Sequence, residues 1–75
     1  MDHPVLRPGP HVGRVTSFDA RRGLGTVTDA DGAEFDFHAT AIVGGSRAIA
    51  PGTDVAFVVH AGHRGRYEAD ALTAV

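Results

Sequence analysis

Cysteine, lysine and tryptophan are absent from this chain of 75 residues, and aromatic residues make up only 7% of it. The lack of cysteine excludes disulfide staples and thiolate metal sites, which is compatible with a reducing cytoplasm. No apolar run approaches the roughly 20 residues of a membrane-spanning helix, and no signal-peptide pattern opens the chain. We therefore expect a cytoplasmic domain with no membrane association, small enough to hold one modest core.

An excess of positive charge is missing too. The net charge is −2 and the pI is near 6.1, whereas a dedicated nucleic-acid-binding domain is usually basic because phosphate neutralisation supplies much of its affinity. The seven basic residues are all arginines, and the planar guanidinium can both stack on bases and hydrogen-bond to phosphate. A composition inherited from a GC-rich genome explains the arginines equally well.

The chain divides into a short arm and one all-β domain. Residues 1–11 hold three of the four prolines without periodicity, so we expect a flexible, extended arm there. Residues 12–75 are expected to form the domain, with the pair Asp31-Gly32 as a hairpin turn and a single helical turn near Thr40–Val43 in a long connection. Short apolar runs between Gly, Asp and Pro predict five strands, at residues 12–18, 23–29, 33–38, 53–60 and 67–74.

Five short strands favour a closed antiparallel barrel, which removes the exposed edges of an open sheet. Alternation along the strands then divides the residues between two faces. The inward set is expected to form the core and comprises Val15, Val27, Phe35, Phe37, Val55, Phe57 and Val59. Leu24, Thr26, Asp36 and His38 are expected on the outer face of the second and third strands.

Four segments resemble the motifs of bacterial cold-shock proteins, over about residues 12–73: GRVTSFDARRGLGTV (13–27), FDFHATAI (35–42), PGTDVAF (51–57) and, loosely, GHRGRYEADAL (62–72). Gly23, Gly25 and Gly52 stand where that family has glycine. The resemblance implies a five-stranded antiparallel OB-fold barrel that binds single-stranded RNA or DNA by stacking bases on aromatic rings across strands two and three. It also implies a role in RNA structure or in cold and stress adaptation.

Most of the rings of that family are replaced in this chain. The family's tryptophan position holds Ser17, and its phenylalanine positions hold Leu24, Thr26, Asp36 and Ala39. A base–ring stack is worth about 1–3 kcal/mol, so the loss of about five stacks at the low end lowers affinity by three to four decades. Asp36 further repels phosphate. We therefore expect weak or altered binding.

The remaining candidates for single-stranded nucleic-acid binding are one ring, one imidazole, the flanking outer-face residues and an arginine rim. They are Phe18, Arg22, Leu24, Thr26, His38, Arg47, Arg64 and Arg66, with Arg14 and Arg21 also on the rim. The alternative is a protein-interaction or self-associating module that has lost the nucleic-acid face. Exposed Leu24 and Val58 would suit such a partner or homodimer.

No catalytic, metal or cofactor site is predicted. His60 and His63 have H-x-x-H spacing, but a zinc site needs three or four ligands and no further ligand converges on them. Gly23-Leu24-Gly25 lacks the third glycine and the following helix of a dinucleotide motif, and fits a sheet position of close approach. No nucleophile stands beside a base. We expect a binding protein and not an enzyme.

Overall fold

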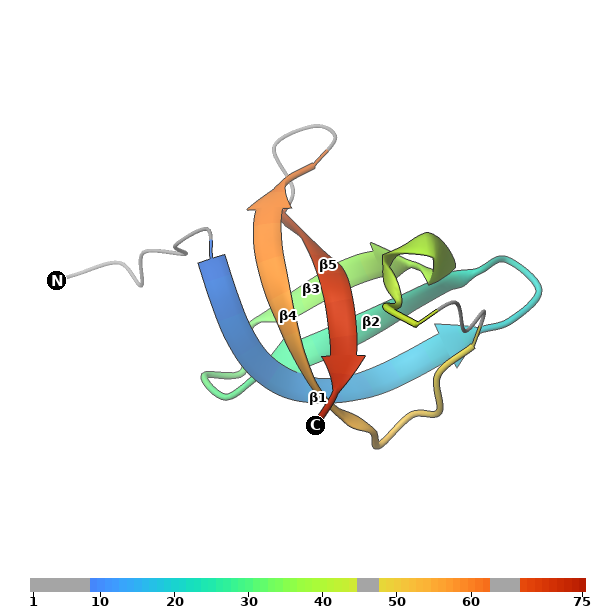
Figure 1. Ribbon diagram of the computed structural model, residues 1–75, viewed down its shortest axis with the longest axis horizontal. Coiled ribbons are helices and arrows are strands. Elements are labelled where there is room, and N and C mark those ends of the chain that lie inside the picture. The colour runs from blue at the N-terminus through green and yellow to red at the C-terminus, as the bar shows by residue number, and fades with distance from the viewer. Residues whose placement is uncertain (1–8, 45–47, 63–66) are drawn as a thin grey trace, which may run out of the picture.

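The computed structural model describes residues 9–44, 48–62 and 67–75. Its strands are β1 (Gly9–Asp19), β2 (Leu24–Asp29), β3 (Glu34–His38), β4 (Asp54–Ala61) and β5 (Tyr67–Ala74), with one 3-10 turn, η1 (Ala39–Ala41), after β3. They form a closed barrel in the order β1-β2-β3-β5-β4. Figure 1 shows β1 as a long curved strand, and its two halves pair with different neighbours, β4 and β2. Within the described residues, no helix is long and apolar enough to cross a membrane.

The predicted strands are all present, but two details of the prediction were wrong. The first concerns direction: β3 and β5 run parallel, while every other neighbouring pair is antiparallel. A closed ring with an odd number of strands cannot alternate direction at every step, so one neighbouring pair must run parallel. The parallel contact joins Asp36 of β3 to Glu68 of β5.

The second correction concerns the start of β1, which begins at Gly9 and not at Val12. Gly9, Pro10 and His11, expected in the flexible arm, pair with Val59, Val58 and Phe57 of β4. The ring of His11 fixes this first part of β1 to the barrel. It stacks on Phe57 with ring centroids 5.6 Å apart and lies 5.8 Å from the ring of Phe35. The remaining residues of the predicted arm, 1–8, lie outside the described part of the chain.

The core matches the alternation read from the sequence. All seven side chains predicted to face inward are buried, Phe35 and Phe37 at 2% and 1% exposure. Ala41 from η1 and Ala69 and Leu72 from β5 complete the cluster. Burying a side chain of this size contributes roughly 1.5–3 kcal/mol relative to leaving it in water. The inward direction of both phenylalanines excludes them as a base-stacking surface on the outside.

One glycine is required by close packing at the centre of the sheet. A Cβ at Gly25 would lie 2.6 Å from Cζ of Phe37 and 2.7 Å from the carbonyl oxygen of Ser17. Real Cβ atoms do not approach other heavy atoms this closely, so a side chain here would displace the Phe37 ring or β1. The close approach expected from Gly23-Leu24-Gly25 is confirmed at its second glycine.

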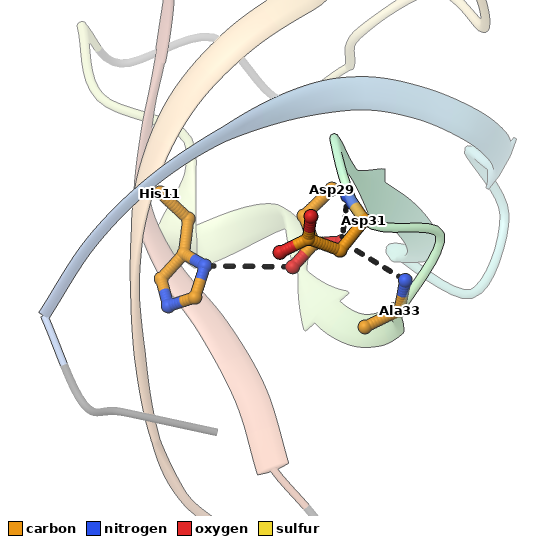
Figure 2. Close-up of polar contacts among 4 residues, drawn as sticks. All are labelled: His11, Asp29, Asp31 and Ala33. Carbon is orange, nitrogen blue, oxygen red and sulfur yellow. Dashed lines mark hydrogen bonds and ion pairs between the residues drawn. The ribbon is translucent and has the colours of Figure 1, made fainter. Parts of the chain in front are cut away.

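The β2–β3 hairpin is closed by a buried carboxylate. Asp29 is 9% exposed, and its Oδ1 accepts hydrogen bonds from the backbone N–H groups of Asp31 and Ala33, both at 2.9 Å. Its Oδ2 lies 3.5 Å from Nδ1 of His11 (Figure 2). The Asp29 carboxylate therefore links the turn to the first half of β1.

Candidate nucleic-acid interface

The outer face of β2 and β3 carries an open hollow of about 340 Å³. Leu24 pairs with His38 and Thr26 pairs with Asp36 across the two strands, so these four side chains share one face. The lining consists of Ser17, Leu24, Gly25, Thr26, Asp36, Phe37, His38 and Glu68. The structure thus brings together three of the residues assigned to the site from the sequence, Leu24, Thr26 and His38.

A cluster of three hydroxyl groups borders the hollow on β1 and β2. Thr26 Oγ1 lies 2.8 Å from Thr16 Oγ1 and 2.7 Å from Ser17 Oγ. Strict alternation would place Thr16 and Ser17 on opposite faces, but a β-bulge between Val15 and Ser17 leaves both exposed. Each hydroxyl can donate one hydrogen bond and accept others, so the cluster can bind either a donor or an acceptor atom of a ligand.

The Phe18 side chain mainly packs against the core. It is half-buried, packs against the core, and stacks on Phe37 with centroids 6.0 Å apart and an interplanar angle of 15°. It lies outside the set of residues that line the hollow. One side of the ring is therefore committed to the core, which leaves only part of it accessible to a base.

The turn between β1 and β2 presents Arg21 and Arg22 at the Leu24 end of the face. Asp19 Oδ1 accepts hydrogen bonds from the backbone N–H groups of Arg21 at 3.0 Å and Arg22 at 3.3 Å. Gly23, with φ of +65°, donates its N–H to the Asp19 carbonyl oxygen at 2.8 Å. Hydrogen bonds to Asp19 therefore fix the backbone of the turn, while both arginine side chains are exposed.

The remainder of the predicted rim falls in two groups. Arg14 lies on the β1–β4 side of the barrel, where its Nε donates a hydrogen bond to Oδ1 of Asp54 at 2.9 Å. Arg47, Arg64 and Arg66 lie outside the described residues.

The opposite wall of the hollow is acidic. Asp36 and Glu68 are partners in the parallel β3–β5 contact and both line the hollow. Glu68 was not recognised from the sequence, because its place depends on the register in which β5 meets β3. The lining thus combines two carboxylates and the His38 imidazole with hydroxyl and apolar groups.

The histidines do not build a metal site in the described part of the chain. His60 Nε2 lies 3.6 Å from Asp70 Oδ2, and both side chains are half exposed. Among the residues described, no three His, Cys, Asp or Glu side chains come together in a way that could hold a metal ion. His63, the other member of the H-x-x-H pair, lies outside them.

The comparisons with known proteins point to the fold. No family model matches the chain, and no curated protein matches it. Among solved structures, the chain is similar to Drosophila Unr CSD456, with a TM-score of 0.74 and 24% sequence identity over 89% of this chain and 27% of that one. The chain therefore spans about a quarter of that longer chain. It has a cold-shock-domain-like fold, a closed five-stranded barrel of the OB type.

Proposed function

We propose that this domain is a non-enzymatic module that binds single-stranded RNA or DNA weakly across β2 and β3. The observation that carries the proposal is the convergence of Leu24, Thr26 and His38 on one open hollow beside the exposed arginines of the β1–β2 turn. This is the face on which the cold-shock resemblance implies that a strand would lie.

Weak affinity follows from the chemistry of the lining. Hydroxyl groups and a carboxylate occupy positions where stacking rings would contribute about 1–3 kcal/mol each. Contacts to phosphate must therefore supply a larger share of the binding free energy. Each phosphate neutralised on a single strand contributes about −0.7 to the slope of log affinity against log salt concentration. Arg21 and Arg22 alone therefore predict a slope of about −1.4. The slope is steeper if the arginines outside the described residues also contact phosphate.

The test is a titration of fluorescent oligouridine and oligothymidine, followed by anisotropy at low salt and then with increasing salt. Arg22→Ala is expected to weaken binding and to reduce the slope by about 0.7. Arg14→Ala is the matched control, because it removes the same charge from the β1–β4 side, where Asp54 pairs with Arg14. The proposal fails if no oligonucleotide binds at low salt, or if the two variants weaken binding equally.

A second candidate is a contact with another protein, and one surface feature favours it. Pro10 pairs with Val58 and Val12 pairs with Ala56 across β1 and β4, so the four side chains form a continuous apolar strip. Val12 is 58% exposed and Val58 38%. Light scattering of the wild-type chain and Val58→Glu tests it: a dimer that this substitution dissociates supports the strip as an interface, and a monomer throughout opposes self-association.

A further inference from the structure

Three accessible hydroxyl groups, those of Thr16, Ser17 and Thr26, meet at the β1–β2 side of the hollow. Ser17 lies directly opposite Thr26 across the two strands, and the bulge after Val15 brings Thr16 to the same side. Thr26 is the middle member, because its Oγ1 contacts both other hydroxyl groups. None of the three side chains carries a ring, so this part of the face can meet a bound strand through hydrogen bonds but not by stacking.

The hydroxyl cluster has as many hydroxyl protons as internal contacts. Thr16 Oγ1 donates to the backbone carbonyl oxygen of Thr26 at 3.3 Å, and either atom can be the donor in the two contacts between hydroxyl groups. Each hydroxyl has one proton to donate, so every contact has its own proton only if Thr26 donates to Thr16 and Ser17 donates to Thr26. The Ser17 oxygen then accepts no hydrogen bond within the cluster. A ligand that donates to Ser17 therefore leaves the cluster intact, whereas a ligand that only accepts must take a proton from one internal contact.

The hydroxyl cluster lies close to the positive charge of the interface. Ser17 and Thr26 are two residues away from the strand pair that flanks the β1–β2 turn, which is about 7 Å along the strands. That turn carries the exposed side chains of Arg21 and Arg22, and guanidinium groups suit phosphate. In a nucleotide the sugar is bonded directly to the phosphate. A phosphate held at the turn therefore brings its own sugar toward the hydroxyl cluster.

We propose that the hydroxyl cluster of Thr16, Ser17 and Thr26 recognises the ribose 2′-hydroxyl, so that the domain binds single-stranded RNA in preference to single-stranded DNA. The inference rests on the proposed function, since it names the class of nucleic acid that the same face binds. The 2′-hydroxyl is the group by which a protein distinguishes RNA from DNA, and it can both donate and accept. It can donate to the Ser17 oxygen without breaking an internal contact, and deoxyribose has no donor at this place.

The experiment changes the sugar and keeps the base constant. Oligouridine and oligodeoxyuridine of roughly eight nucleotides, within the length that one OB fold covers, differ only in the 2′-hydroxyl, and anisotropy at low salt gives both affinities. The net contribution of one hydrogen bond between neutral groups corresponds to an affinity change of about twofold to tenfold. We therefore expect oligouridine to bind roughly fivefold more tightly than oligodeoxyuridine.

A third oligonucleotide separates the hydroxyl group from the conformation of the sugar. In 2′-fluoro oligouridine the fluorine keeps the sugar pucker that RNA favours, but it cannot donate a hydrogen bond. We expect its affinity to be close to that of oligodeoxyuridine. An affinity equal to that of oligouridine would assign the preference to sugar conformation and would overturn the role of the hydroxyl cluster.

Substitutions in the hydroxyl cluster test the same role from the protein side. Thr26→Val and Ser17→Ala each remove one hydroxyl, and both are expected to reduce the ratio of RNA to DNA affinity toward one. The two changes lie on different strands, so a folding defect in one variant leaves the other as the test. Thr28→Val is the matched control, because Thr28 lies two residues further along β2 and outside both the hollow and the cluster. It is expected to leave the ratio unchanged.

The outcomes distinguish the proposed function from the preference for RNA. If no oligonucleotide binds, the proposed function fails, and the preference fails with it. If RNA and DNA bind equally, or if Thr26→Val and Ser17→Ala keep the wild-type ratio, only the role of the hydroxyl cluster is overturned. A preference for RNA that both variants reduce and Thr28→Val preserves supports both proposals.

Discussion

Replacing Asp29 with alanine tests how far one buried carboxylate holds the β2–β3 hairpin, the element that carries most of the candidate interface. Its Oδ1 accepts the N–H groups of Asp31 and Ala33 at 2.9 Å each, and its Oδ2 lies 3.5 Å from Nδ1 of His11 (Figure 2). Alanine removes all three interactions. It also opens a space beside the His11 ring.

The magnitude follows from the unequal exposure of the two donors. A hydrogen bond to a charged group contributes about 1.5–3 kcal/mol, and a buried donor left unpaired costs about 1–3 kcal/mol. Asp31 is exposed, so water can replace its bond, whereas Ala33 is half-buried and packs against the core. We therefore expect a loss of about 2–4 kcal/mol. For 75 residues at about 0.05–0.15 kcal/mol per residue, the whole domain is stable by about 4–11 kcal/mol.

The measurement is urea unfolding followed by circular dichroism. With an m-value of about 1 kcal/mol/M for a small protein, Asp29→Ala lowers the midpoint by about 2 M or more. Asp29→Asn is the control, because its amide oxygen can still accept both N–H groups while the charge beside His11 is lost. We expect it to lose about 1 kcal/mol at most. Equal midpoints for the two variants would refute the role assigned to the backbone hydrogen bonds.

Three further substitutions test local features of the fold and the turn. Ala71 has φ of 52°, a conformation that costs a non-glycine residue about 1–2 kcal/mol, so Ala71→Gly is expected to raise the melting temperature by a few degrees. A decrease would contradict the strain. Gly25→Ala places a Cβ 2.6 Å from Phe37 Cζ and is expected to cost about 1–3 kcal/mol by overpacking, which calorimetry would show as a lower melting temperature. An unchanged value would oppose the close-packing argument. Asp19→Ala is expected to speed amide exchange at Arg22, whose N–H loses its acceptor, while Asp19→Asn preserves protection. Equal exchange rates in both variants would rule out the carboxylate as the organiser of the turn.

The core was predictable from the sequence because alternation fixes which side chains share a face once the strands are placed. Phe35 and Phe37 are two residues apart, and burial of one requires burial of the other in a regular strand. The same argument placed Thr26 and His38 on the outer face, and both now line one hollow. These predictions needed only the local geometry of one strand.

The features that were missed depend on relations between strands. The bulge in β1 places Thr16 beside Ser17 on the outside, and no residue in VGRVTSF marks its position. Glu68 reaches the hollow through the parallel register of β5 against β3. His11 was assigned to a proline-rich arm, but its ring packs against Phe35 of β3 and Phe57 of β4, which are distant in the sequence.

The fold and the ligand chemistry of this barrel are carried by alternate residues of the same strands, so they can change independently. In β3 the inward residues Phe35 and Phe37 fill the core, while Asp36 between them contributes only to the outer face. Replacing an outward ring by a carboxylate therefore removes a stacking surface without opening a cavity. A shared barrel consequently says little about affinity or base preference, which must be argued from the outward residues.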